Sequence, residues 1–465
     1  MNFSAFCLLF SMDVFKRFEK VFDFPLTLTD ASLIRVCIVN VLLIEINPFS
    51  QVLTPISSGY IASFLKSRGF NAKILSLGEN THISPTNLCE IVRRFNPALV
   101  GLSAYQRTML YVNGLARLIK SVNRDIKIII GGPQATFMPS SAFYELPDID
   151  YICRSSGEET LLRVAQAVKN GVPFSNLLGV SYKDEKGEVF DTEGLDASTD
   201  LDHYPSPYLD DVFDFSRMDE ALMLTSRGCP HDCIFCYTPH AFKHKISYHS
   251  VERVIEEIRW IRKKGVKRLW FADPNISFKP ARIMEIFDRM LSDGLEMQIW
   301  LQTRADLVNT EVMKMMKRAG VSTIAFGLES ASERVLAKLG KHISTEKVAE
   351  AIKLAQNEKI EVELFTVFGL PYETFEDAVM TLEFVKANKV KIMGNTNSQQ
   401  MQVYFGTKIA RHYEEYKIKP LSNKRPAYLA IGNNFETDCM TYNEIIKIQN
   451  LWRANSIDRG RRIVS

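Results

Sequence analysis

The chain has 465 residues, of which 46% are hydrophobic and 24% are charged. This length exceeds one ordinary hydrophobic core and predicts about two to three domains. A formal charge of +3 without a dense basic block gives no electrostatic reason to expect a nucleic acid partner. The short basic groups "RWIRKK" and "RGRR" are interpreted as solvated surface.

Neither a secretion signal nor a membrane span is expected. The amino-terminal stretch "MNFSAFCLLFSMDVFKRFEK" has a short apolar run, but no basic segment precedes it and no small-residue cleavage site follows it. No stretch reaches the roughly 18 uninterrupted apolar residues that span a bilayer. Five of the eight cysteines lie singly, which favours a reducing cytoplasm over a disulfide framework: Cys7, Cys37, Cys89, Cys153 and Cys439.

After an N-terminal extension of residues 1–32, residues 33–190 alternate between short apolar runs and amphipathic stretches. Strands are expected at 36–46, 71–77, 98–104 and 126–132, and helices at 59–70, 87–95 and 112–122. Strands rich in Val and Ile that alternate with helices predict a parallel sheet covered on both faces, a doubly wound domain. Ligands of such sheets lie beyond the carboxyl ends of the strands, here "IEINPFS", "SAYQRT" and "GGPQATF". The stretch "GVSYKDEKGEVF" predicts a closing hairpin.

Residues 191–217 are rich in Asp, Pro, Ser and Tyr without a period and are expected to be an interdomain linker. A second series follows in residues 218–415, with six expected strands at 221–226, 266–273, 296–303, 322–330, 360–370 and 399–405. Its helices show the apolar spacing of one buried face; Gly265 is expected to stop one, and Thr374 with Asp377 to cap another. Six units are fewer than the eight of a closed barrel and predict an open, partial barrel. Residues 416–465 form a C-terminal region that the pattern does not classify.

Cys229, Cys233 and Cys236 form a C-x3-C-x2-C array shortly after the first strand of the second series. Barrel-like folds place their chemistry on such loops. A cubic 4Fe–4S cluster has four irons, so three cysteines leave one iron free to bind a substrate or cosubstrate. Two other interpretations stay open: a structural zinc site that adds His240 as the fourth ligand, and three unligated core thiols.

The array, with Phe235 before its last cysteine, resembles the signature of the radical S-adenosylmethionine (SAM) enzymes. The segments "FADPNISF", "QTRADLV", "FGLESASERVLAKLGKHIS" and "VFGLPYET" look like later segments of that family in their usual order, so the resemblance covers roughly residues 220–410. It implies that Cys229, Cys233 and Cys236 hold a 4Fe–4S cluster and that SAM chelates the fourth iron. The zinc interpretation becomes minor beside it.

The resemblance also suggests which residues surround SAM. Glu329, at the end of a strand, would accept hydrogen bonds from an amino group or ribose hydroxyls, and Arg304 would pair with the methionine carboxylate. Gly327 and Gly369 would let the backbone approach the adenosine. The alternatives are a structural ion pair between Arg304 and Glu329 and ordinary strand-end turns for the glycines. Asp273 is expected to face either substrate or solvent.

The first region resembles the cobalamin-binding domain of vitamin B12-dependent radical SAM enzymes, carried by "TPISSGYIASFLKSRGF", "GGPQATF" and "DYICRSSGEETLLRVAQAV". Gly131 and Gly132 would lie against the nucleotide tail of the cofactor, and Ser103 and Thr108 would hydrogen-bond its amide arms or simply end a strand. The loop after the first strand contains no histidine for cobalt, and His82 is expected at the surface. The other interpretation is a degenerate domain kept for packing or for a protein partner.

The fold expected from these resemblances is α/β, with an N-terminal doubly wound (Rossmann-like) B12-binding domain before a partial (β/α)6 radical SAM barrel. The first hypothesis for function is a cobalamin-dependent methyltransferase that acts on an unactivated carbon through a 5′-deoxyadenosyl radical and methylcobalamin. An oxidative cyclase or rearrangement enzyme without methyl transfer and a non-catalytic metal-binding or scaffold protein are the alternatives. The partners expected are a small-molecule or peptide substrate and a reductase, flavodoxin or ferredoxin as electron donor.

Two departures from the family pattern concern specificity. "YFGTKIA" has Phe405 where relatives often carry proline, and "RSSGEE" has serines where relatives often show a further Gly-Glu. The tail either covers the mouth of the barrel or packs into the core, with these residues as candidates: Tyr428, Asn433, Asn434, Phe435 and Cys439.

Overall fold

The computed structural model describes residues 39–47, 54–78, 83–172, 177–184, 186–192, 194, 198–216, 218–392, 400–422 and 424–456. The N-terminal extension and His82 lie outside these residues. Within them, no helix has both the length and the apolar character that a bilayer crossing requires.

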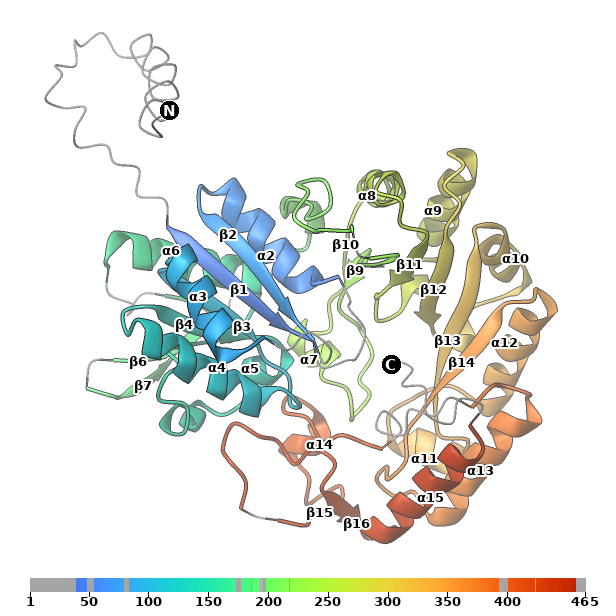
Figure 1. Cartoon of the computed structure of the whole chain (residues 1–465). Coiled ribbons are helices and arrows are strands. Elements are labelled where there is room, and N and C mark those ends of the chain that lie inside the picture. Colours follow the sequence, from blue (N-terminus) through green and yellow to red (C-terminus); the bar gives the residue numbers. More distant parts are fainter. Residues whose placement is uncertain are drawn as a thin grey trace, which may run out of the picture. The chain divides into compact units, whose positions relative to one another are not determined.

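The first region is built on a seven-stranded sheet with the order β2-β1-β3-β4-β5-β6-β7 (Figure 1). Strands β1 to β5 pair in parallel, and the predicted hairpin is confirmed because β6 pairs antiparallel with both β5 and β7. The strands are β1 (Asn40–Ile46), β2 (Asn71–Leu77), β3 (Leu99–Ser103), β4 (Lys127–Gly131), β5 (Tyr151–Cys153), β6 (Val180–Lys183) and β7 (Val189–Asp191).

Helices cover both faces of this sheet, as the doubly wound prediction requires. Helices α2 (Ile56–Ser67) and α6 (Gly157–Asn170) contribute to one hydrophobic cluster, and α3 (Pro85–Phe95) and α4 (Met109–Val122) to another. The short helix α5 (Pro133–Phe137) follows β4 directly. Because β1, β3 and β4 are buried on both faces, their sequences read as continuous apolar runs.

The second region has a five-stranded parallel sheet with the order β14-β13-β12-β11-β8, flanked by helices (Figure 1). The strands are β8 (Glu220–Met223), β11 (Arg268–Phe271), β12 (Gln298–Thr303), β13 (Val321–Glu329) and β14 (Glu361–Thr366). The sixth predicted strand appears in the described residues only as a parallel bridge between Phe368 and Gln400 and an antiparallel bridge between Val403 and Gly432. The sheet is therefore open, as the partial-barrel prediction expects.

Six helices flank the strands of this region, and the two end signals given by the sequence are present. They are α8 (Val251–Lys263), α9 (Pro280–Ser292), α10 (Thr310–Arg318), α11 (Glu333–Lys338), α12 (Thr345–Asn357) and α13 (Phe375–Ala387). Gly265 follows α8 with a positive φ of 86°, and the capping box of Thr374 with Asp377 is present at the start of α13. The shorter elements are β9 (Ser226–Arg227), α7 (Thr238–Ala241) and β10 (Ser247–Tyr248).

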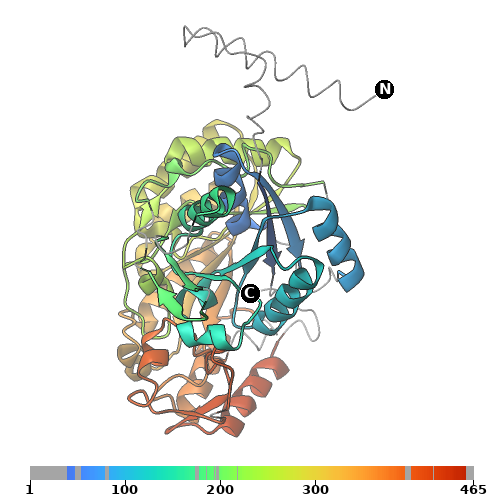
Figure 2. The same ribbon diagram turned by 90° about the vertical axis from the view of Figure 1, so that its left-hand side faces the viewer.

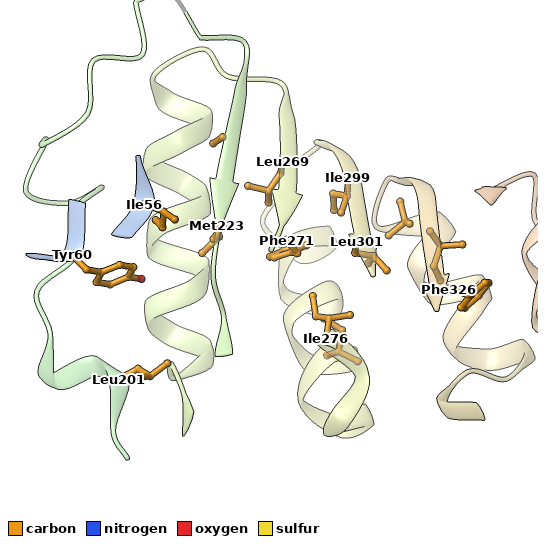
Figure 3. Packing of buried hydrophobic residues seen from close by; sticks show 14 of the residues in the cluster. Ile56, Tyr60, Leu201, Met223, Leu269, Phe271, Ile276, Ile299, Leu301 and Phe326 are labelled. Atoms are coloured by element: carbon orange, nitrogen blue, oxygen red, sulfur yellow. The ribbon is translucent and has the colours of Figure 1, made fainter. Parts of the chain in front are cut away.

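The two regions share one hydrophobic core. Ile56 and Tyr60 of α2, Leu201 of the expected linker and Met223 of β8 belong to the cluster that continues through the barrel strands (Figure 3). The expected linker carries few regular elements, as predicted, yet it is packed: Tyr208 has no exposed surface. Tyr60 and Tyr208 thus help to join the face of α2 and α6 to the barrel.

A buried polar network accompanies this junction. Nδ1 of His249 lies 2.7 Å from Oδ1 of Asp202, and its Nε2 lies 2.9 Å from the hydroxyl of Tyr60. Since a carboxylate only accepts, His249 donates to Asp202 and accepts from Tyr60, the pattern of a neutral imidazole. Arg227 forms an ion pair with Glu158 of α6 at 2.8 Å and lies over the ring of Tyr60, 4.7 Å from its centroid.

The C-terminal part of the chain returns to the first region, running below its sheet in both views (Figures 1 and 2). Gln134 donates to the carbonyl of Tyr428 at 2.7 Å, and Gln106 exchanges two hydrogen bonds with the backbone of Ala430. Tyr428 itself packs into the hydrophobic cluster of α3 and α4, while Phe435 is fully buried in the other cluster. Core packing, one of the two roles considered for the tail, is therefore what these two aromatic residues do.

The remaining elements of this part are α14 (Lys408–Arg411), β15 (Ile418–Pro420), β16 (Phe435–Thr437) and α15 (Tyr442–Ala454). β15 and β16 pair antiparallel, and α15 contacts α13 of the barrel. The residue limits of the five segments proposed from the sequence stay predictions.

The buried imidazole predicts a pH dependence of stability. Burial lowers the pKa of His249 to about 4, so the unfolded chain, with a histidine pKa near 6.5, binds a proton that the folded chain excludes. The free energy of unfolding therefore falls as the pH drops below about 6.5, and this histidine accounts for about 2 kcal/mol between pH 7 and pH 5. Between pH 7 and pH 5, the free energy of unfolding of His249→Gln, measured with urea, should fall by about 2 kcal/mol less than that of the wild type. His412→Gln is an exposed control, and its free energy of unfolding should fall as much as that of the wild type. An equal fall in the free energy of unfolding of all three proteins between pH 7 and pH 5 would contradict the assignment of this effect to His249.

Candidate functional site

The loop that carries the three cysteines is held at its start by Asp273. This carboxylate accepts hydrogen bonds from the Thr225 amide at 3.0 Å and the Thr225 hydroxyl at 2.9 Å, and it also contacts the Ser226 hydroxyl. Asp273 is fully buried, and burial raises its pKa. It therefore faces neither substrate nor solvent, the two possibilities that the sequence suggested, and instead fixes the strand end before the loop.

Gly228, directly before Cys229, can only be glycine in this backbone. Its φ is +96°, and a Cβ built on it would lie 2.0 Å from the carbonyl oxygen of Lys245. The preceding residue, Arg227, pairs with Glu158 of the first region. The start of the cysteine loop is therefore tied to both regions of the chain.

Ile234 anchors the middle of the loop. Its amide donates to the carbonyl of Leu339 at 3.1 Å, and its carbonyl accepts from the amide of Ile409 at 3.2 Å. The amide of Cys236 closes a turn on the carbonyl of Cys233 at 3.1 Å. Phe235, the aromatic residue of the motif, is half-buried and packs against the barrel core.

The chemistry of the three thiols fits a cluster. Burial raises the pKa of Cys229, Cys233 and Cys236, to about 11 for Cys233, while the charge of Lys341 acts on each in the opposite direction. Such thiols are protonated at neutral pH, so iron must displace their protons when it binds. In the part of the chain that the structure describes, no three His, Cys, Asp or Glu side chains form a group that could hold a single metal ion. A 4Fe–4S cluster places its three thiols on three different irons, so they need not converge on one ion.

The conformation of Gly228 predicts a specific loss. Gly228→Ala should leave little iron and sulfide in the anaerobically reconstituted protein, because the new Cβ would collide with a backbone carbonyl and displace the loop. Gly265→Ala is the matched control, since its φ of +86° is similar but no atom lies within 4 Å of the added Cβ. Equal cluster content in the two variants would overturn this account of the loop.

Glu329 and Lys341 form a buried ion pair beside the loop. Nζ of Lys341 lies 2.6 Å from Oε1 of Glu329, and the two side chains are only 8% and 10% exposed. A Cβ on Gly327 would lie 2.6 Å from that Nζ and 2.7 Å from that Oε1, so the glycine makes room for the pair. Glu329 has a φ of +63°, and the pairing of β13 with β14 shifts register between Gly327 and Glu329. This strained strand end turns the carboxylate toward the cysteines.

Arg304 has other partners. Its Nε and Nη2 donate to the two carboxylate oxygens of Asp306 at 2.9 and 2.8 Å, and Nη2 also donates to the carbonyl of His342 at 3.0 Å. Arg304 and Glu329 therefore do not form the ion pair that was considered as an alternative. Arg304 pairs with Asp306, and Glu329 pairs with Lys341. The sequence gave no role to Lys341; a lysine shortly after the "FGLES" strand end was the only signal that could have found it.

Gly369, with a φ of +81°, lies against the side chain of Ile445 in α15, where a Cβ would come within 3.0 Å. Its amide donates to Oε2 of Glu373 at 2.7 Å, and the amide of Leu370 donates to the same oxygen at 3.2 Å. Burial raises the pKa of Glu373 to about 8. The structure therefore gives Gly369 a role in the turn itself, and its contact with adenosine stays a prediction.

The buried pair predicts a stability pattern. Lys341→Met should lower the free energy of unfolding by about 3–5 kcal/mol, because it leaves the Glu329 carboxylate buried without a partner. The double variant Lys341→Met with Glu329→Gln should recover most of the lost free energy of unfolding, which urea unfolding measures. Lys391→Met, which breaks an exposed pair with Glu361 at 2.5 Å, should cost less than about 1 kcal/mol. A double variant as unstable as Lys341→Met would contradict this.

Small residues line the strand ends of the first region. Ser103 ends β3, and its hydroxyl accepts from the amide of Ile46 at 2.7 Å, while Thr108 exchanges hydrogen bonds with the backbone of Tyr105. Gly132 has a φ of +105°, and its Cβ would lie 3.0 Å from the carbonyl of Ala104. These contacts already account for strand-end turns.

The same edge nevertheless fits a flat, bulky cofactor. Small residues lie at or just after three neighbouring strand ends and let a ligand approach the backbone: Ser103 and Ala104 at β3, Gly131 and Gly132 at β4, and Ser155 and Ser156 beyond Arg154 after β5. The contacts of Ser103, Thr108, Gly131 and Gly132 with cobalamin stay predictions.

A set of aromatic residues that the sequence did not indicate lies between this edge and the cysteine loop. Tyr237, which follows Cys236, contacts Tyr404 edge-to-face with ring centroids 6.3 Å apart. Burial raises the pKa of Tyr105, and the charge of Glu45 and the phenol of Tyr237 act in the same direction. These three tyrosines come from the loop after β3, the cysteine loop and the C-terminal part, and each is half-buried.

Two family models match the chain in order, the B12 binding domain over residues 45–165 and the radical SAM superfamily over residues 223–385. An uncharacterized methyltransferase of Pyrococcus horikoshii is 31% identical over 337 residues, which are 71% of this chain and 73% of that protein. An anaerobic magnesium-protoporphyrin IX monomethyl ester cyclase of Rubrivivax gelatinosus is 25% identical over 338 residues, 70% of this chain and 61% of that protein.

Among solved structures, the radical SAM methyltransferase TsrM from Kitasatospora setae superposes with a TM-score of 0.74. It is 16% identical, and the match covers 89% of this chain and 88% of that one. At this identity the likeness concerns the fold, and it confirms the predicted order of a Rossmann-like region before a parallel-sheet barrel.

Proposed function

Because the chain belongs to the radical SAM enzymes that carry a B12-binding domain, we propose that it transfers a methyl group to an unactivated carbon of its substrate. The cofactors of this enzyme are a 4Fe–4S cluster, SAM and cobalamin, as the sequence predicted. When bound, they supply a 5′-deoxyadenosyl radical that removes a hydrogen atom and a methyl group that replaces it. The observation that carries methyl transfer is the 31% identity to a protein named as a methyltransferase, spread over both regions.

The chain's own residues have three tasks in this proposal. Cys229, Cys233 and Cys236 hold the cluster on a loop whose start and middle are fixed by hydrogen bonds. Glu329 accepts hydrogen bonds from SAM at the strained end of β13. Lys341, a buried cation whose charge acts on all three thiols, is a second candidate beside Arg304 for the methionine carboxylate; Lys341 is paired with Glu329, and Nε and Nη2 of Arg304 donate to Asp306.

The substrate is a small molecule or a peptide in this proposal, and it lies between the strand ends of the first region and the cysteine loop. In this proposal the half-buried Tyr105, Tyr237 and Tyr404 would limit the access of water to a radical formed there. An external protein must supply the electron that the cluster passes on. The free thiols of Cys89, Cys153 and Cys439 agree with a reducing cytoplasm.

A second candidate, cobalamin-assisted ring closure without methyl transfer, is favoured by the cyclase among the relatives. The two candidates differ in the products of SAM. A methyltransferase remethylates reduced cobalamin from SAM and so releases S-adenosylhomocysteine as well as 5′-deoxyadenosine.

The test uses the anaerobically reconstituted protein with reduced cobalamin and SAM. We expect about one equivalent of S-adenosylhomocysteine per bound cobalamin, measured by chromatography. Formation of 5′-deoxyadenosine alone would favour the cyclase-like candidate and contradict methyl transfer.

A variant separates the two cofactor sites. Cys233→Ala should abolish the cleavage of SAM to 5′-deoxyadenosine, because it removes a cluster ligand. Cobalamin uptake, followed by its visible absorbance, should persist because the strand ends of the first region are untouched. Loss of both would count against two separate cofactor sites, and Cys439→Ala, an exposed cysteine, serves as the control.

A further inference from the structure

The two faces of the barrel sheet differ in how they are covered. Successive residues of a strand point to opposite faces, and α10 and α12 contact the face on which Phe271 and Leu301 are buried (Figure 3). The opposite face carries three half-buried aromatic residues: Trp270 of β11, Trp300 of β12 and Phe365 of β14. In the part of the chain that the structure describes, these three belong to neither hydrophobic cluster and do not pack against either one.

The three aromatic side chains contact one another and one carboxylate. The rings of Trp270 and Trp300 meet edge-to-face with centroids 4.7 Å apart, and the centroid of Phe365 lies 6.4 Å from that of Trp300. Nε1 of Trp300 donates to Oε2 of Glu363 at 3.1 Å. This bond crosses β13, whose residues at this level are small: Thr323, Ala325 and Gly327. Trp270, Trp300, Phe365 and Glu363 are named the aromatic patch here.

Glu363 is the only charged member of the aromatic patch, and it is half-buried. Burial raises its pKa, and the charge of Glu361 acts in the same direction, while the hydrogen bond from Trp300 opposes both. Among the described residues no Lys or Arg pairs with Glu363, and its Oε1 makes no hydrogen bond. A carboxylate held partly out of water is stabilised by a positive charge with N–H donors, so the patch complements a cation.

The aromatic patch adjoins the site that holds the buried ion pair. Phe365 of β14 pairs in register with Gly327 of β13. Gly327 in turn makes room for the pair of Glu329 with Lys341 beside the cysteine loop. A ligand bound on the patch therefore extends along the sheet toward the strand end at which SAM is proposed to bind.

We propose that the aromatic patch binds a protonated amino group of the substrate. This inference rests on the proposed function and names the substrate class of that site, an amine. The ammonium lies against the rings of Trp270 and Trp300 and donates a hydrogen bond to Oε1 of Glu363. Because Trp300 already holds Oε2, the carboxylate is oriented before the amine arrives. No bond is made or broken at the patch, which only positions the substrate.

The test compares two probes of nearly the same shape. One is 2-phenylethylamine, which is protonated at neutral pH, and the other is 2-phenylethanol, which is neutral. Their binding to the anaerobically reconstituted full chain is measured by isothermal titration calorimetry. The wild type should bind the amine about tenfold or more tightly than the alcohol, because the alcohol lacks both the charged hydrogen bond and the cation–π contact. Equal affinities, or no binding of the amine, overturn the proposal.

Substitutions locate the amine on the patch. Glu363→Gln should weaken binding of the amine about tenfold or more and leave binding of the alcohol unchanged, because glutamine keeps an acceptor for Trp300 but carries no charge. Glu361→Gln is the matched control, since this carboxylate of the same strand is exposed and paired with Lys391, and it should behave as the wild type. A Glu363→Gln variant that binds the amine as tightly as the wild type would overturn the assignment.

A second variant keeps the test valid should Glu363→Gln disturb folding. Trp270→Leu removes one ring and leaves the bond between Trp300 and Glu363 in place. It should weaken binding of the amine about threefold or more through the lost cation–π contact. Unchanged binding of the amine by this variant counts against the patch.

The outcomes separate this inference from the function on which it rests. Calorimetry requires neither SAM cleavage nor methyl transfer. A chain that binds the amine through Glu363 but forms no S-adenosylhomocysteine contradicts the proposed function alone. A chain that forms S-adenosylhomocysteine but binds the amine and the alcohol equally overturns the amine site alone.

Discussion

The structure depends on how hydrogen bonds from both regions hold a short loop with three thiols in place. A cluster that leaves one iron for SAM has only three protein ligands. Each of these three cysteines must therefore be held in a fixed place. Asp273 holds the strand end before the loop, Gly228 allows the turn, and the backbone of Ile234 is bonded on both sides. None of these groups needs to touch a cofactor, yet each limits where the cysteines can lie.

The same loop couples the two regions. Arg227, two residues before Cys229, pairs with Glu158 and lies over Tyr60, so the first region contacts the cysteine loop through a buried charge and an aromatic ring. A buried ion pair adds little net stability, but removing one partner is costly, so such pairs specify one arrangement rather than strengthen it. The pair of Arg227 with Glu158 therefore fixes how the cysteine loop lies against the first region.

Much of the fold follows from the sequence because the signals are local. The strand at 71–77, the hairpin at 180–191 and the cap of Thr374 with Asp377 depend on near neighbours in the chain, and the structure has each of them. The sixth barrel strand was overestimated, since Gln400 and Val403 pair only as isolated bridges. The roles of Asp273 and of the tail depend on contacts between distant residues, such as that of Gln134 with Tyr428, and no period in the sequence encodes them.

The cysteines of the candidate site were predicted from their spacing together with the family resemblance, whereas the role of Lys341 beside them was not predicted. Lys341 was missed because its role arises from a strained strand end and the absence of a side chain at Gly327. The most direct test of the central claim is the electron paramagnetic resonance spectrum of the reduced, reconstituted protein before and after addition of SAM. The account predicts a 4Fe–4S signal whose g values change when SAM binds the free iron; a signal that SAM leaves unchanged, or zinc in place of iron and sulfide, would contradict it.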